Sequence, residues 1–276
     1  MPVIATNTAA NTALRYLNSN AAEQSSSLSK LASGSRITKA SDDAAGLAIG
    51  TQLKADVTAL STAATNSSQA SSILQIADGG LSNISDILQR LKSLATTSAS
   101  GNVTDDQRTG DLQTEWDQLV EEIDSIASGT RYAGNSLLDG TSDYAAGVSF
   151  LVGTTSSDTI SVTLDSATTS ALGLSSASIS TAADASAAID LIDTAIQTIT
   201  EDRASVGASE SRFNFHSENI STSSENVSAA ESTIMDADVA AEKSDLASAD
   251  VMTQASVAAL AQATKIPQEL LQLLEG

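Results

Sequence analysis

Cysteine is absent from this 276-residue sequence, which excludes both a disulfide framework and a metal site built on thiolates. Aromatic residues are also scarce, with three Phe, three Tyr and one Trp. The hydrophobic share of 41% is still enough for a core, but Ala, Ser and Thr are abundant. Side chains this small favour narrow seams between close-packed helices over a thick globular centre.

Basic residues are few, because 13 Lys and Arg stand against 34 Asp and Glu, which gives a net charge of −21. This charge repels nucleic acid phosphates and anionic membrane surfaces, so we expect no nucleic acid partner. No window approaches about 18 continuous apolar residues, which argues against membrane insertion. The N-terminus also lacks the basic and apolar regions of a secretory signal peptide. By these signals alone the protein is expected in the cytoplasm.

The sequence offers few residues for catalysis. Its one histidine, His216, falls just after Phe213 on a predicted helix, where a histidine is more often structural than catalytic. There is no phosphate-binding loop, no dinucleotide fingerprint and no HExxH motif. The carboxylate clusters lack the spacing of a calcium loop and are interpreted as solvated faces and helix starts: Asp42 with Asp43, Asp105 with Asp106, and Asp236 with Asp238 and Glu242. We therefore expect no enzyme, no metal site and no cofactor.

Seven apolar side chains in the C-terminal half recur at a strict spacing of seven residues. Such a repeat corresponds to about 3.5 residues per turn, so the helix that carries it supercoils against a partner helix. At about 1.5 Å per residue, the stripe predicts a helical segment of about 60 Å. We call these residues the rod seam: Ile192, Ile199, Val206, Phe213, Ile220, Val227 and Ile234.

Helical periodicity also marks the rest of the chain. It predicts helices over residues 8–33, 42–99, 112–129 and 237–274, in addition to the striped helix over 182–236. The helix over 42–99 is apolar along two lines, so it is expected to face two neighbours, and the short helix around Trp116 supplies a third wall. His216 and Arg203 then lie at the edge of the rod seam as packing residues.

Local signals give details of the helix over 42–99. Ser41 is expected to cap its start, with Asp42 and Asp43 in the positive first turn. Gly79 and Gly80 each cost about 1 kcal/mol in a helix interior, which predicts an irregularity there.

Residues 130–180 change from helical to alternating periodicity. Two alternating runs flank the turn-like sequence GTTSSD and predict a β-hairpin: Val148, Phe150 and Val152 on one side, and Ile160, Val162 and Leu164 on the other. The predicted fold is therefore mainly α, a long antiparallel helical bundle or coiled-coil rod with a small β-hairpin at mid-chain.

The two chain ends form amphipathic helices with little to bury. Residues 1–37 and 246–276 hold sixteen Val, Ile or Leu side chains among 68 residues. This apolar surface is too small to offset the backbone entropy lost when so many residues become ordered. The ends are therefore expected to fold when neighbouring copies add burial, which indicates self-assembly.

Several separate stretches, in the same order, resemble bacterial flagellins, the filament subunits of the flagellum. The N-terminal ones are NTAANTALRYLNSN, SSSLSKLASGSRITKASDDAAGLAIGTQLKAD and SILQIADGGLSNISDILQRLKSLATTSASG. The C-terminal ones are RASVGASESRF, ENVSAAESTIMDAD and QASVAALAQATKIPQELLQLL. The hairpin sequence FLVGTTSSDTISVTLDSA, followed by LGL, is similar to the β-element of the family's inner rod domain.

The resemblance implies a structural subunit that self-assembles into the extracellular flagellar filament for motility. Residues 1–40 with 240–276 form the inner tube in this reading, 41–140 with 181–239 the helical rod, and 141–180 a hairpin region within the rod. The inner-tube assembly residues are expected to be Leu14, Leu17, Leu28, Leu31, Leu260, Leu270, Leu271, Leu273 and Leu274. Only the hairpin region lies between the two rod halves, so a thin, smooth filament is expected.

The same resemblance replaces the cytoplasmic expectation with export through the flagellar export apparatus, without a cleaved signal peptide. It implies an export chaperone bound at the C-terminal arm, and cap and junction proteins at the filament. It also implies recognition by a vertebrate Toll-like receptor at a surface formed by Leu88, Gln89, Arg90, Leu94 and Glu115. Cytosolic innate sensors of the family read the C-terminal leucines, here Leu270, Leu271, Leu273 and Leu274.

Two other functions compete with the filament reading. A hook-filament junction protein would share the terminal arms, but the DDAAGLAIG and ENVSAAES stretches favour a filament subunit. An enzyme or adhesin built on a helical bundle is the remaining alternative.

Overall fold

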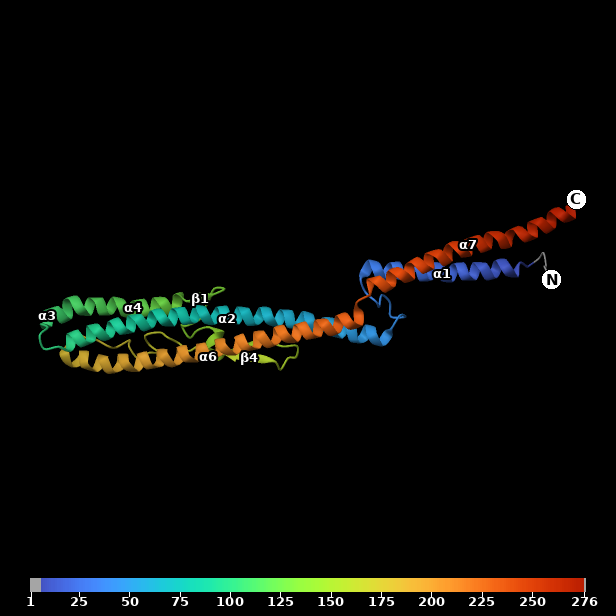
Figure 1. The fold of residues 1–276 in the computed structure, drawn as a ribbon. Coiled ribbons are helices and arrows are strands. Elements are labelled where there is room, and N and C mark those ends of the chain that lie inside the picture. Colours follow the sequence, from blue (N-terminus) through green and yellow to red (C-terminus); the bar gives the residue numbers. More distant parts are fainter. Residues whose placement is uncertain (1–5, 276) are drawn as a thin grey trace. The chain divides into compact units, whose positions relative to one another are not determined.

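The computed structural model describes residues 6–275, with side chains through residue 265. The helices are α1 (Thr8–Ser33), α2 (Ala44–Ala99), α3 (Asp105–Gln107), a π-helical turn (Arg108–Leu112), α4 (Gln113–Gly129), α5 (Asp143–Ala146), α6 (Ala182–Met235) and α7 (Val239–Glu275). The strands are β1 (Arg131–Tyr132), β2 (Asn135–Ser136), β3 (Val148–Leu151) and β4 (Thr159–Val162). The predicted fold class, long helices with a small β-element at mid-chain, is confirmed (Figure 1).

The described residues form two compact units. Those up to residue 55 and from residue 226 onward make the terminal unit, and residues 56–225 make the central unit. Both α2 and α6 contribute to both units. This boundary falls inside the helices, whereas the sequence-based division placed it near residues 40 and 240.

In the central unit, α2, α4 and α6 lie side by side, and the β-hairpin covers one flank (Figure 1). Helices α2 and α6 run antiparallel, because Asp78 binds Arg203 at 2.8 Å and Gln75 binds Glu210 at 2.9 Å. The core between them follows heptad spacing on both helices. On α2 the buried line is Leu60, Ala63, Ser67, Ala70, Leu74, Ala77, Leu81, Ile84, Leu88, Leu91, Ala95 and Ser98.

The rod seam lies on the buried face of α6 through the central unit. Ile192, Ile199, Val206, Phe213 and Ile220 are at most 4% exposed, and the last two seam residues, Val227 and Ile234 in the terminal unit, are half-buried. Large residues of the seam alternate along α6 with Ala188 and Ala195 at the intervening heptad positions. This alternation of large and small side chains lets the helices interdigitate.

Helix α4 and the β-hairpin complete the hydrophobic core of the central unit. Trp116 on α4 is 1% exposed, and its indole N–H donates to the carbonyl of Ala177 at 3.2 Å. Strands β3 and β4 pair antiparallel with Phe150 opposite Ile160. Phe150 meets Phe213 of α6 edge to face, with ring centroids 5.7 Å apart. The hairpin is therefore part of the hydrophobic core of the rod rather than an appendage.

The predicted irregularity at Gly79 and Gly80 was wrong, because α2 continues through both residues without interruption. Gly80 is buried, and a Cβ there would come within 2.6 Å of Thr130 Oγ1 and 2.8 Å of Leu138 Cδ1. The glycine thus allows the chain after α4 to approach α2 closely, which compensates for its low helix propensity.

Helix ends were predicted better at the C-terminus of α1 than at the N-terminus of α2. Gly34 ends α1 in the left-handed region at φ 72°, as its lack of a Cβ favours. Asp43, not Ser41, caps α2, because its carboxylate accepts from the backbone N–H groups of Ala45 and Gly46. Ser41 lies further from the first turn of the helix than the sequence suggested.

Sequence reasoning also missed the corner that joins α2 to α4. The corner is held by Arg108, which is 7% exposed. Its guanidinium donates to the carbonyls of Ser98 and Ser100 at 2.7 and 2.9 Å and pairs with Asp105 at 2.8 Å. Buried arginine is stable only with such partners, which here are the end of α2 and the start of α3.

Candidate assembly surfaces

The described part of the terminal unit is built on the pairing of α1 with α7 (Figure 1). Both helices turn a heptad seam inward, and the seam is mostly small or polar. On α1 it comprises Ala10, Ala13, Leu17, Asn20, Gln24, Ser27 and Leu31, and on α7 Glu242, Leu246, Ala249, Thr253, Ser256, Leu260 and Ala263. Thr253 Oγ1 is buried there without a hydrogen-bond partner. Such a seam buries little apolar surface, so it stabilises the pair weakly.

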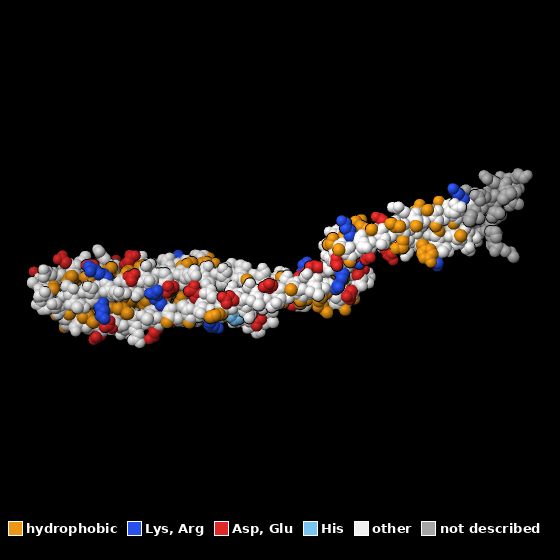
Figure 2. Space-filling view, in the orientation of Figure 1, with side chains coloured by type: hydrophobic (Ala, Val, Ile, Leu, Met, Phe, Trp, Pro, Cys, Tyr) orange, Lys and Arg blue, Asp and Glu red, His pale blue; other side chains and the backbone are white. Residues whose placement is uncertain are grey.

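Larger apolar side chains of the two helices face solvent instead. On α1 these are Leu14, Tyr16 and Leu28, which are 46%, 58% and 58% exposed. On α7, Val251, Met252 and Val257 are exposed by 66%, 46% and 52%. Figure 2 shows hydrophobic atoms along the surface of this helix pair. Scattered exposed leucines are common, but repeated ones on a two-helix pair with a polar seam mark an interaction surface.

The predicted inner-tube residues therefore divide into two groups. Leu17, Leu31 and Leu260 are half-buried in the seam, whereas Leu14 and Leu28 point outward. Beside Tyr16, a shallow groove of about 520 Å³ is lined by Thr8, Ala9, Thr12, Ala13, Ala259 and Ala263. The side chains of Leu270, Leu271, Leu273 and Leu274 lie outside the described residues.

Backbone contacts hold the base of the helix pair. Ser35 and Asp236 form an isolated antiparallel bridge, and the N–H of Arg36 donates to the carbonyl of Met235 at 2.6 Å. The Arg36 guanidinium also donates to the carbonyl of Ile234 at 2.6 Å. Ile37, 4% exposed, anchors the intervening loop. The segment that follows α1 and the segment that precedes α7 are thereby fixed to each other.

The expected receptor surface lies on α2 and α4 of the central unit. Arg90 and Glu115 form a salt bridge of 2.6 Å, with both side chains partly exposed, and Gln89 is exposed beside them. Leu88 is 0% and Leu94 4% exposed, so both belong to the core beneath this surface. The polar members of the predicted set, and not its two leucines, are available to a partner protein.

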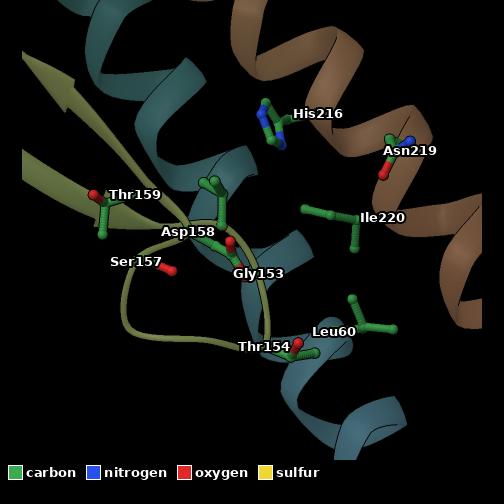
Figure 3. A pocket seen from close by; sticks show the side chains of 10 residues that line it. Leu60, Gly153, Thr154, Ser157, Asp158, Thr159, His216, Asn219 and Ile220 are labelled. Atoms are coloured by element: carbon green, nitrogen blue, oxygen red, sulfur yellow. The ribbon is translucent and has the colours of Figure 1, made fainter.

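The pocket around His216 has no catalytic arrangement (Figure 3). It measures about 440 Å³ and lies between the hairpin turn, α2 and α6, with Leu60 and Ile220 at its base. The carboxylate of Asp158 caps its own turn by accepting from Thr155 N–H at 3.0 Å. Hydrogen bonds from Thr155 lower the pKa of Asp158, with a smaller contribution from His216. Asp158 is thus a structural anion, and no hydrogen bond joins the His216 imidazole to a hydroxyl group of the lining residues that the structure describes.

The described residues offer neither a cluster of metal ligands nor a membrane-spanning helix. No group of three or more His, Asp or Glu side chains among them is placed to hold a metal ion. In the same part of the chain, no helix is both long and apolar enough to cross a membrane.

Asp202 is a charged residue at a seam position of α6, which sequence reasoning did not single out. It falls in the heptad register between Ile199 and Val206, and its Oδ2 is buried without a hydrogen-bond partner. Burial, together with the nearby carboxylates of Asp165 and Glu201, raises the pKa of Asp202 to about 6. Folding therefore disfavours the ionised form of Asp202 relative to the unfolded chain.

We expect Asp202→Asn to stabilise the central unit at pH 7.5 by on the order of 1 kcal/mol, a value reduced because the carboxyl is partly hydrated. A raised folded-state pKa contributes stability below the unfolded value of 3.8 that is lost as pH rises through about 6. The gain should therefore disappear near pH 4. Urea unfolding followed by fluorescence measures it, because Trp116 is the one Trp of the chain and lies in the central unit.

Asp190→Asn is the matched control for this experiment, because it makes the same substitution at an exposed position of α6. It should change stability little at either pH. An Asp202→Asn gain that persists unchanged at pH 4 would show that the effect does not come from the ionised carboxylate.

Comparison with known proteins shows which family the sequence matches. The model of the bacterial flagellin N-terminal helical region matches residues 4–143, and that of the C-terminal helical region matches residues 189–274. Flagellin of Halalkalibacterium halodurans is 38% identical over 275 residues and covers 99% of both chains. Flagellin of Bacillus subtilis is 36% identical over 300 residues, covering 97% of this chain and 98% of its own.

A flagellin is also among the solved structures that this chain resembles. The crystal structure of Bacillus cereus flagellin matches with a TM-score of 0.52 and 31% identity, over 60% of this chain and 94% of that one. A putative flagellar hook-associated protein from Vibrio parahaemolyticus matches with a TM-score of 0.57 over 71% of this chain and 100% of its own. Its identity is 16%, so that likeness shows the fold alone.

Proposed function

The chain belongs to the bacterial flagellin family, and from that premise we propose which of its surfaces join the copies of the filament. Flagellins are structural proteins and not enzymes, and this chain is a filament subunit that self-assembles for motility. The hook-junction alternative has no better support, because the hook-associated likeness shows the fold alone.

We assign the inner tube to residues 1–40 with 240–276, the rod to 41–140 with 181–239, and the hairpin region of the rod to 141–180. The single observation that carries the inner-tube assignment is the reversed polarity of the α1–α7 pair, with polar groups in its seam and apolar side chains outside. Neighbouring copies bury Leu14 and Leu28 in the tube, whereas Leu17, Leu31 and Leu260 hold the pair together within each copy. The leucines of the last turns, Leu270, Leu271, Leu273 and Leu274, extend the tube contacts.

Negative-stain microscopy of purified protein induced to polymerise tests this function. Long, thin and smooth tubes are expected, because only the hairpin region lies between the two rod halves. Short caps or monomers under all polymerising conditions would instead favour a junction role or another helical-bundle function.

The individual partner proteins are proposed from the family resemblance and from the exposed apolar side chains of α7. An export chaperone covers the α7 arm before assembly, where Val251, Met252 and Val257 are exposed and need shielding from premature association. Cap and junction proteins contact the filament ends, and the protein reaches the cell exterior through the flagellar export apparatus.

The receptor surface consists of Gln89, Arg90 and Glu115, supported from below by the buried Leu88 and Leu94. A vertebrate Toll-like receptor docks there through the exposed ion pair. Arg90→Glu should reduce receptor activation in a reporter-cell assay about tenfold, because it puts a carboxylate beside Glu115 and reverses the charge offered to the receptor.

Arg131→Glu is the matched control, because it makes the same charge change at an exposed arginine of the central unit outside this surface. Equal loss of activation by both variants would assign the effect to overall charge and not to the Arg90 surface.

A further inference from the structure

The α1–α7 seam contains direct side-chain contacts that the assembly function alone does not explain. Asn20 Nδ2 donates to Ser256 Oγ at 2.9 Å, and Gln24 Nε2 donates to Asp250 Oδ1. Near the base, Lys30 Nζ lies 3.6 Å from Glu242 Oε2. The residue numbers rise on α1 as they fall on α7, so these contacts form a ladder across an antiparallel pair.

The apolar residues of the seam do not select one pairing of the helices. Both seams repeat every seven residues, and all of their apolar members are Ala or Leu. These two kinds of side chain fit against one another in several alignments. A slip of seven residues would therefore keep a seam residue opposite a seam residue along most of the pair.

The polar ladder distinguishes these alignments. A slip of seven residues moves Asn20 from Ser256 to Ala249 or Ala263, neither of which has a side-chain acceptor. The same slip moves Asp250 from Gln24 to one of the seam leucines of α1, Leu17 or Leu31, which leaves its carboxylate against an apolar side chain. Each slipped alignment loses both hydrogen bonds, as a polar seam residue does when it specifies register in a coiled coil.

We propose that the Asn20–Ser256 and Gln24–Asp250 contacts, together with the backbone contacts of Ser35 and Arg36 at the base, set the register of α1 on α7 and thereby align the outward apolar residues of both helices for contact with neighbouring copies. This inference rests on the proposed function, because register matters only if those residues meet other copies. A slip of one heptad would shift Leu14 and Leu28 by about 10 Å relative to Val251 and Val257. The outward surface would then no longer match that of a correctly paired neighbour.

An isosteric exchange tests the proposal in the full-length chain. Gln24→Glu places two carboxylates opposite each other and removes the donor, so the critical concentration for polymerisation should rise about tenfold or more. Adding Asp250→Asn restores one amide and one carboxylate with their positions exchanged. The double variant should return to within about threefold of the unmodified chain. Sedimentation of polymer against total protein concentration measures both values.

Gln69→Glu is the matched control, since it makes the same change at an exposed position of α2 in the central unit, outside the helix pair, and it should polymerise like the unmodified chain. The register proposal is overturned if Gln24→Glu polymerises normally, or if Asp250→Asn fails to rescue it. Absence of polymer from the unmodified chain is a different result, because it contradicts the filament function itself.

Discussion

Replacing Leu14 and Leu28 together by aspartate is expected to raise the critical concentration for polymerisation at least about a hundredfold. Both side chains are about half exposed in the single chain, so their burial must come from other copies. Burying the remaining half of a leucine stabilises by about 0.7–1.5 kcal/mol, so the two together correspond to about one to two orders of magnitude in an association constant. Aspartate adds a desolvation penalty at the same contacts.

The variant should remain a folded monomer, since neither leucine packs in the central unit. Unfolding followed by Trp116 fluorescence should therefore match the unmodified chain, while pelleting assays show no polymer. Ser19→Asp with Ser29→Asp is the matched control, because it adds two carboxylates to exposed positions of α1 outside the α7 seam. Normal filament growth by the Leu14 and Leu28 variant would remove the assigned role of this face.

Replacing Phe213 by alanine is expected to destabilise the central unit by about 3–5 kcal/mol and to lower its melting temperature by about 10 °C. The side chain is 1% exposed and packs edge to face on Phe150 of the hairpin. Its loss leaves a cavity between α6 and β3 and also removes the aromatic pair. Thermal and urea unfolding of the monomer, followed by Trp116 fluorescence, measures the change.

Phe215 provides a control within the same helical turn. It is 70% exposed, so Phe215→Ala removes the same side chain without leaving a cavity. Its effect on unfolding should be within about 0.5 kcal/mol. Similar losses in the two variants would show that helix propensity, and not burial against the hairpin, explains the Phe213 result.

The amino-acid sequence determined the secondary structure closely. The helix over 8–33 matches α1 (Thr8–Ser33), and the hairpin runs match β3 and β4. These elements depend on side-chain periodicity and on local breakers such as Gly34, which are readable without knowing any neighbour. The family itself was also recognisable from the sequence, because its motifs recur in order along the chain.

The electrostatic and steric roles of single residues could be found only from the residues that surround them in the structure. From the sequence, Gly80 is only a poor helix former. In the structure it lets Thr130 and Leu138, fifty residues or more along the chain, pack closely against α2. Asp202 carries no local signal, because its raised pKa comes from burial and from Asp165 on another segment. Arg108 likewise gains its role from carbonyls at the end of α2.

The orientation of α1 shows most clearly where sequence stops and tertiary structure decides. The periodicity of α1 predicts an amphipathic helix whose seam runs through Leu14, Leu17, Leu28 and Leu31, interrupted by Gln24. In the structure Leu17, Gln24 and Leu31 do face α7, but Asn20 and Ser27 take the remaining seam positions and Leu14 and Leu28 face outward. Periodicity fixes the spacing along a helix, but which of two adjacent lines faces inward depends on the partner's side chains. Here the small and polar residues of α7 pack against Asn20 and Ser27 and leave Leu14 and Leu28 outside.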